Sequence, residues 1–244
     1  MGTGLKGRYM IIVSLTSWNK RIDQARDTVD SLLKQTRKPD RIELNLDLQN
    51  FPQAYGSTPR WIREYTEKYD NFYVYFEIVD LKVYSKIMPT IVRHARELEN
   101  TTVITCDDDV HYPIRYVEEI ENNMKDNDWL CSQHNVITQG QFMAYSGKAL
   151  KAFYVEIDRD FMNNVLLDDN GLFWIMYKYR LKRGKKIESK CEDRQAGYSF
   201  RRLFVKCDDV SELKDSTCEY PPEQFIKERD YLIRRGIIRP IIKK

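Results

Sequence analysis

Three adjacent carboxylates, Asp107, Asp108 and Asp109, follow the apolar run 101–105. At the end of a buried strand they repel one another and lose hydration, so they need a neutralising partner. In an extended segment residues i and i+2 share a face, which predicts that Asp107 and Asp109 converge while Asp108 points away. Two convergent carboxylates suit Mg²⁺ or Mn²⁺. The alternative is an acidic turn that caps the helix expected after Pro113.

One histidine lies close to these carboxylates in the sequence. His111 is two residues beyond Asp109. Its position makes it a candidate third metal ligand. A partly exposed turn histidine is the alternative interpretation.

The elements expected before the acidic triplet alternate between strand and helix. The run 9–16 is continuously apolar, which is typical of a parallel strand buried on both faces. Helices are predicted over 23–35, 60–69 and 86–98, and further strands over 41–46, 72–79 and 101–105. This order predicts right-handed βαβ units in one mostly parallel sheet flanked by helices, an α/β fold.

Polar residues end all four predicted strands. Thr16 and Ser17 follow the first, Asp47 the second, Asp80 the third and the acidic triplet the fourth. Each alone is a good turn or cap residue. Ligands of such sheets bind beyond the carboxyl ends of the strands, so together these residues predict a ligand site at that edge.

The second half of the chain is less regular. We expect a helix over 114–124, strands over 129–137 and 142–145 around a turn at 139–140, and a helix over 172–183 that ends at Gly184. No linker divides the chain, so one domain is predicted. Its expected parts are a flexible leader (1–8), two halves (9–112 and 113–220) and a C-terminal segment (221–244).

Composition limits the class of protein. The 244 residues are 42% hydrophobic and 32% charged, as in an ordinary soluble domain. The net charge of +3 is too small to indicate a nucleic-acid partner. The 5 cysteines form no CxxC pair, which favours reduced thiols and a cytoplasmic location. No apolar run approaches the roughly 20 residues of a transmembrane helix.

The last segment, 225–244, interleaves aliphatic residues with lysine and arginine. An amphipathic basic segment can bind peripherally to an anionic surface, here the inner face of the cytoplasmic membrane. Packing onto the domain is the alternative and is ranked slightly ahead. Pro240 excludes a single unbroken helix.

Taken together, these motifs resemble nucleotide-sugar glycosyltransferases of the GT-A fold, particularly the bacterial family-2-like enzymes. The matching segments are 13–17 with Arg21, 31–40, 85–89, 105–110, and 167–169 with Trp174. The resemblance implies a Rossmann-like GT-A domain in which 9–112 binds the nucleotide sugar and 113–220 the acceptor.

The resemblance also implies individual roles. The donor would be a nucleotide-diphosphate sugar, with a UDP-sugar favoured, and the cofactor Mn²⁺ or Mg²⁺. Asp107 and Asp109 would hold the metal, with Asp109 the more direct ligand. The implied donor-binding residues are Thr16, Ser17 and Arg21 (nucleotide and phosphates), Asp47 (base), Asp80 (base or ribose), Lys86 (diphosphate), Asp107 and Asp108.

A second acidic pair occupies the position of the catalytic base in these enzymes. Asp169 is the first choice and Asp168 the second, and the acceptor would be a hydroxyl of a glycan or lipid-linked glycan in bacterial surface polysaccharide synthesis. A helix cap is an equal alternative for either residue. No Gln-x-x-Arg-Trp motif follows, which argues against a processive synthase and leaves inversion or retention open.

Two other functions stay open. A nucleotidyltransferase acting on sugar phosphates normally has a glycine-rich loop after the first strand, and 15–21 contains no glycine. A non-catalytic module that binds sugar nucleotides is the second alternative, although it would have no physical reason to retain both acidic clusters.

Overall fold

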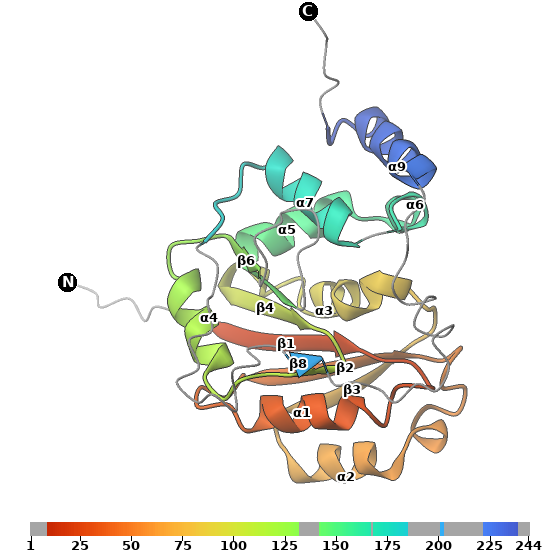
Figure 1. Cartoon of the computed structure of the whole chain (residues 1–244), viewed down its shortest axis with the longest axis vertical. Coiled ribbons are helices and arrows are strands. Elements are labelled where there is room, and N and C mark those ends of the chain that lie inside the picture. The colour runs from red at the N-terminus through yellow and green to blue at the C-terminus, as the bar shows by residue number, and fades with distance from the viewer. Residues whose placement is uncertain (1–8, 132–141, 167, 185–200, 203–221, 239–244) are drawn as a thin grey trace, which may run out of the picture.

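The computed structural model describes residues 9–131, 142–166, 168–184, 201–202 and 222–238. Four predicted features lie outside these residues: the leader 1–8, the strand beyond residue 131, the turn at 139–140 and the chain beyond residue 238. Figure 1 shows the arrangement of the elements.

A six-stranded sheet forms the centre of the molecule, in the order β3-β2-β1-β4-β7-β6. The first four strands along the chain are mutually parallel, whereas β7 is antiparallel to β4 and β6 is antiparallel to β7. The strands are β1 (Met10–Thr16), β2 (Arg41–Asp47), β3 (Phe72–Glu77), β4 (Thr101–Cys106), β6 (Trp129–Cys131) and β7 (Phe142–Tyr145). A small second sheet pairs β5 (Val110–His111) with β8 (Arg201–Arg202). The predicted mostly parallel α/β sheet is therefore confirmed.

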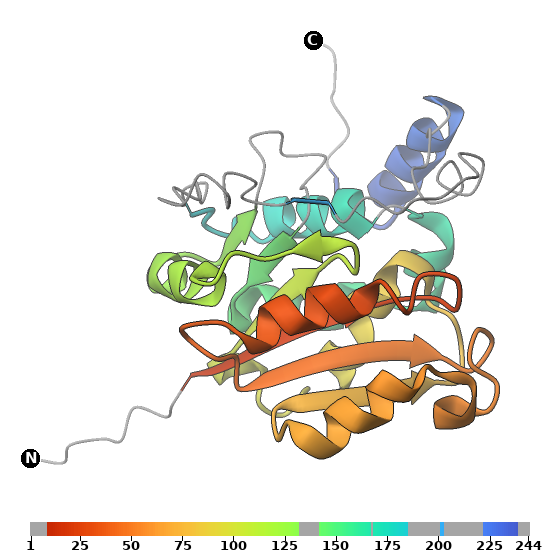
Figure 2. The same cartoon turned by 60° about the horizontal axis from the view of Figure 1, so that its bottom comes forward.

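Helices cover both faces of the large sheet. Figures 1 and 2 show α1 and α2 on one side and α3, α5 and α7 on the other. The helices are α1 (Ala25–Leu33), α2 (Arg60–Lys68), α3 (Met88–Arg93), α4 (Tyr116–Met124), α5 (Gly147–Glu156), α6 (Arg159–Asn164), α7 (Asp168–Lys178) and α9 (Pro222–Arg234). Three short 3-10 helices, η1 (Ala54–Ser57), η2 (Lys82–Lys86) and η3 (Leu98–Asn100), join them.

Strand β1 is buried on both faces, which explains its continuous apolar run. Ile11, Val13 and Leu15 belong to the hydrophobic cluster under α1, α2 and α4. Ile12 belongs to the second cluster, with α3, α5 and α7. Successive side chains of a strand alternate between its faces, so both layers pack on this one strand.

Most predicted helices end within two residues of their predicted bounds, but two differ more from the prediction. The predicted helix 86–98 is divided: η2 ends at Lys86 and α3 begins at Met88, with Pro89 in its first turn, where a missing N–H costs nothing. The predicted helix 172–183 begins earlier, at Asp168, and ends at Lys178. Arg180 has a φ of 51°, so the backbone enters the left-handed region before Gly184.

A polar network lies between α3 and the sheet. The side chain of Glu43 on β2 is 0% exposed. Its carboxylate accepts hydrogen bonds from Arg41 at 2.8 Å, Arg93 at 2.5 Å and Thr90 at 3.0 Å, and lies 2.8 Å from His94 Nε2. Burial acts to raise the pKa of Glu43, but these cationic and hydrogen-bonding partners outweigh burial and lower the pKa to about 2.

We predict an acid-labile contribution to stability from Glu43. A carboxyl whose folded pKa is depressed stabilises the fold above its unfolded pKa, and this stabilisation is lost as the pH falls through the folded value. Between about pH 4.5 and pH 2 the free energy of unfolding should therefore fall by about 3 kcal/mol through Glu43 alone. Urea unfolding at several pH values should show a shallower acid dependence for Glu43→Gln than for the unmodified chain. Equal slopes would contradict the assignment.

The C-terminal helix α9 packs onto the domain. Leu232 and Ile237 are buried in the second cluster, and the Tyr231 hydroxyl donates to Asp160 at 2.8 Å. This is the packing alternative from the sequence, and contact of the segment with a membrane remains a prediction. Among the described residues, no helix is both long and apolar enough to span a bilayer.

Candidate active site

The acidic triplet forms a turn rather than a strand. Strand β4 ends at Cys106, and the chain turns at Asp108 and Asp109 before β5 begins at Val110. The prediction that Asp107 and Asp109 share a face with Asp108 turned away is therefore wrong in its premise, because it required extended backbone. In the turn, Asp108 and Asp109 approach the same cation.

That cation is Arg21. Its Nη2 lies 2.5 Å from Asp108 Oδ1 and 3.0 Å from Asp109 Oδ2. Asp108 also accepts a 2.6 Å hydrogen bond from the Ser17 hydroxyl, and the Thr28 hydroxyl donates to its backbone carbonyl at 2.9 Å. The loop after β1 and helix α1 thus hold the turn in place. The chain supplies its own counter-ion to two of the three carboxylates.

The environment of Asp108 is apolar enough to disfavour its charge. Burial raises the pKa of Asp108 to about 6, although the charge of Arg21 and the hydrogen bond from Ser17 oppose the rise. The negative charges of Asp109 and Asp107 also raise the pKa of Asp108. Asp108 and Asp109 are both buried, and Asp108 receives hydrogen bonds from Ser17 and Arg21.

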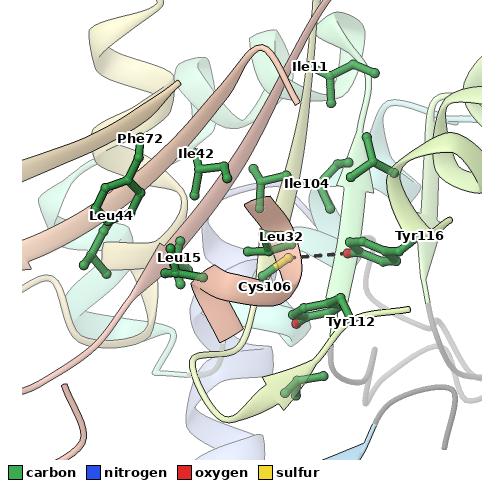
Figure 3. Packing of buried hydrophobic residues seen from close by; sticks show 14 of the residues in the cluster. Ile11, Leu15, Leu32, Ile42, Leu44, Phe72, Ile104, Cys106, Tyr112 and Tyr116 are labelled. Atoms are coloured by element: carbon green, nitrogen blue, oxygen red, sulfur yellow. Dashed lines mark hydrogen bonds between the residues drawn. The ribbon is translucent and has the colours of Figure 1, made fainter. Parts of the chain in front are cut away.

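Asp107 faces a different cation. Its carboxylate is 29% exposed, and Oδ1 lies 3.8 Å from Nζ of Lys86 at the end of η2. The backbone N–H of Asp107 donates to the hydroxyl of buried Tyr112 at 3.0 Å. Figure 3 shows Tyr112 and Tyr116 next to Cys106, with a dashed line for the 3.4 Å contact between Cys106 Sγ and the Tyr116 hydroxyl. The buried side chains of Tyr112 and Tyr116 therefore pack against the end of β4, and Tyr112 fixes the first residue of the turn through its hydrogen bond.

The other predicted strand-end residues make local contacts. Thr16 donates its hydroxyl hydrogen to the Asn45 carbonyl at 2.7 Å. Asp47 accepts two hydrogen bonds from Asn50, one from its backbone N–H at 2.8 Å and one from its side chain at 2.9 Å. Asp80 accepts from the backbone N–H of Lys82 at 2.7 Å. Within the part of the chain that the structure describes, these hydrogen bonds stay at the ends of the first three strands and do not involve the acidic triplet.

The turn suits a cation that arrives with a phosphorylated ligand. Within the described part of the chain, no group of three or more histidine, cysteine, aspartate or glutamate side chains is arranged to hold a metal. Mg²⁺ is commonly held by one or two carboxylates and completes its shell with water and substrate phosphates. Asp107 and Asp109 carry hard oxygen donors of the kind that Mg²⁺ and Mn²⁺ prefer, and in this structure those donors face Lys86 and Arg21 respectively. His111 is exposed, two residues beyond Asp109 on β5.

The two aspartates predicted as the catalytic base, Asp168 and Asp169, are the first residues of a helix, because α7 starts at Asp168. The side chains of Asp168 and Asp169 are outside those that the structure describes. The residues just before them are well anchored: the Val165 carbonyl accepts from the hydroxyl of buried Tyr84 at 2.8 Å, and the Leu166 N–H donates to Glu228 at 2.7 Å.

The structure therefore joins part of the predicted site directly. Ser17 and Arg21 contact Asp108, Arg21 also contacts Asp109, and Lys86 lies beside Asp107. Sequence reasoning missed Thr28, Tyr112, Tyr84 and Glu228. Each acts through a hydrogen bond to a backbone group, and for Thr28, Tyr84 and Glu228 that group is more than 60 residues away, so no sequence motif predicts the bond.

Comparison with solved structures confirms the fold. The chain superposes on Staphylococcus aureus TarS residues 1–349 in complex with UDP-GlcNAc with a TM-score of 0.59 at 11% identity, covering 96% of this chain and 68% of that one. A second structure of TarS 1–349 gives a TM-score of 0.52 at 11% identity. The match covers 72% of this chain and 57% of the TarS chain. No protein-family model matches the sequence, and no curated protein matches it. The likeness confirms the predicted GT-A-like glycosyltransferase fold.

Proposed function

We propose that this chain is a glycosyltransferase that moves a sugar from a nucleotide-diphosphate donor, preferably a UDP-sugar, to a hydroxyl of a glycan or lipid-linked glycan. The observation that carries the proposal is the acidic turn at the carboxyl edge of the sheet, with Arg21 and Lys86 beside it. Its support is the fold shared with TarS, which has been solved with UDP-GlcNAc. Synthesis of a bacterial surface polysaccharide would be a setting for this reaction.

The residues at the turn suit a diphosphate leaving group. As the bond between the anomeric carbon and the β-phosphate oxygen breaks, negative charge develops on the departing nucleoside diphosphate. Lys86, whose Nζ lies 3.8 Å from Asp107, would stabilise this charge. Asp107 and Asp109 would hold Mn²⁺ or Mg²⁺, which supplies further charge stabilisation when bound.

The acceptor needs a base at the same time. Its hydroxyl oxygen forms the new bond to the anomeric carbon, and the proton passes to a carboxylate. In the proposed single displacement with inversion, Asp169 is that base, with Asp168 second, because the pair opens α7. The nucleoside diphosphate leaves with the electron pair of the broken bond.

A binding experiment tests the metal and the nucleotide together. UDP with Mn²⁺ should raise the melting temperature of the chain, because a ligand that binds only the folded state stabilises it. Asp109→Asn should weaken Mn²⁺-dependent UDP binding by about tenfold or more, equivalent to at least ~1.4 kcal/mol. Titration calorimetry measures this, with Asp70→Asn, an exposed carboxylate before β3, as the matched control.

The result also separates the functional classes. Release of UDP from a UDP-sugar with Mn²⁺ present supports the transferase. Binding without turnover on any sugar nucleotide would favour the non-catalytic module. Unchanged Mn²⁺-dependent UDP binding in Asp109→Asn would refute the assigned metal position.

A further inference from the structure

A buried carboxylate from the far end of the chain contacts the segment that leads to the candidate base. Glu228 lies in α9 and is 0% exposed. Its Oε1 accepts the Leu166 N–H at 2.7 Å across 62 residues of sequence. Leu166 is two residues before Asp168, where α7 begins. A fully buried carboxylate is costly unless it is hydrogen-bonded, so this contact accounts for part of what keeps Glu228 in place.

The same segment is anchored from a second direction. The hydroxyl of Tyr84, in η2, donates to the Val165 carbonyl at 2.8 Å. Lys86 is at the end of the same short helix and faces Asp107. The backbone before α7 is therefore joined on one side to the donor-facing element and on the other side to α9.

Helix α9 is itself firmly attached. Arg235 donates to Asp158 at 3.0 Å and to the Glu156 carbonyl at 3.1 Å. Tyr231 donates to Asp160, and Leu232 is buried. Asp158 also caps α6 by accepting from the Phe161 N–H at 2.7 Å. These contacts hold α9 and the residue just after it against the end of α5 and the start of α6, so Glu228 reaches Leu166 from a supported helix.

We propose that Glu228 is a positioning residue for the transfer reaction: through the Leu166 N–H it sets where α7 begins, and so where Asp168 and Asp169 stand relative to the donor. The proposal rests on the proposed function, in which one of these aspartates removes the acceptor proton. It gives α9 a part in the active site without contact with any substrate.

Substitution of Glu228 separates positioning from general stability. Glu228→Leu keeps the volume close and removes the acceptor, and it also removes a buried charge whose desolvation opposes folding. A base displaced by about 1 Å loses roughly tenfold to a hundredfold in rate, so Glu228→Leu should lower kcat for UDP release by that factor. KM for the donor should stay within about twofold, because the nucleotide contacts are elsewhere.

Two further variants control this measurement. Glu228→Gln retains an acceptor oxygen and should recover kcat to within about threefold. Lys227→Ala changes the exposed neighbour on the same helix and should leave kcat and KM unchanged. Hydrogen exchange of a peptide covering 165–171 should be faster in Glu228→Leu alone.

Each outcome decides the proposal. A normal kcat in Glu228→Leu overturns it, whether or not the exchange is faster. If Glu228→Leu does not fold, Tyr84→Phe replaces it: a lower kcat at unchanged KM supports the proposal, and a normal kcat with normal exchange overturns it. If the unmodified chain turns over no sugar nucleotide, the proposed function fails on its own, and unchanged exchange in Glu228→Leu would separately refute the anchoring.

Discussion

Replacing Arg21 by leucine should lower the free energy of unfolding by about 3 kcal/mol at pH 7.5, a loss of roughly 6–12 °C in melting temperature. Arg21 contacts Asp108 and Asp109 at once, and its side chain is only 19% exposed. Without it, two carboxylates in a water-poor turn lose their counter-ion. The cost arises mainly from the charges that remain, and not from the lost attraction itself.

The effect of Arg21→Leu should depend on pH. Burial already raises the pKa of Asp108 to about 6, and loss of the opposing charge of Arg21 raises it further. A carboxyl whose pKa is higher in the folded than in the unfolded protein lowers the free energy of unfolding as the pH rises from the unfolded pKa to the folded pKa. If the pKa of Asp108 is higher in the variant, the variant continues to lose stability at pH values above 6, where the unmodified chain no longer does. The deficit of the variant should therefore be largest above pH 6 and shrink towards pH 5, a range that avoids the titration of Glu43.

Urea unfolding at pH 5 and pH 7.5 measures this deficit. Arg63→Leu, an exposed arginine on α2, is the matched control and should change stability little. Adding Asp108→Asn to Arg21→Leu should recover part of the loss at pH 7.5, because one uncompensated charge is gone. A deficit that is equal at both pH values would contradict the role of Arg21 as counter-ion.

The fold was predictable because its signals are local. The run 9–16 is apolar throughout since β1 is buried on both faces, and the strand–helix alternation up to residue 106 defines parallel crossovers. Helix ends were less predictable. The end of α7 depends on the left-handed backbone at Arg180, and no glycine marks that position.

The site was predictable in its location and not in its contacts. Strand ends brought Ser17, Arg21 and the acidic triplet to one edge, as expected for this topology. The i,i+2 rule failed at Asp107 and Asp109 because the backbone leaves the strand at Cys106. The ion pairs of Arg21 with carboxylates 87 and 88 residues later in the chain were not expected, and its contact with donor phosphates stays a prediction.

Replacing Asp169 by asparagine should lower kcat for UDP release from a UDP-sugar by about 10²–10⁴-fold, the usual contribution of a general base. Asparagine keeps the size of the side chain and cannot accept the acceptor proton at neutral pH. Binding of UDP with Mn²⁺ should stay within about twofold, because the base contacts the acceptor side of the reaction. Asp168→Asn is the matched control, one residue away at the start of the same helix, and should retain most of kcat.

The competing interpretation, a helix cap, makes a different prediction. An acidic side chain in the first turn of α7 stabilises the helix by about 1 kcal/mol, so either substitution would lower the melting temperature and leave kcat of the folded protein unchanged. The two readouts therefore separate base from cap. If only Asp168→Asn loses kcat, Asp168 and not Asp169 is the base. Both residues stand at the start of α7, next to the anchored Leu166, so either can take this role. Normal kcat in both variants would leave the pair as a cap and require the proton to be taken elsewhere.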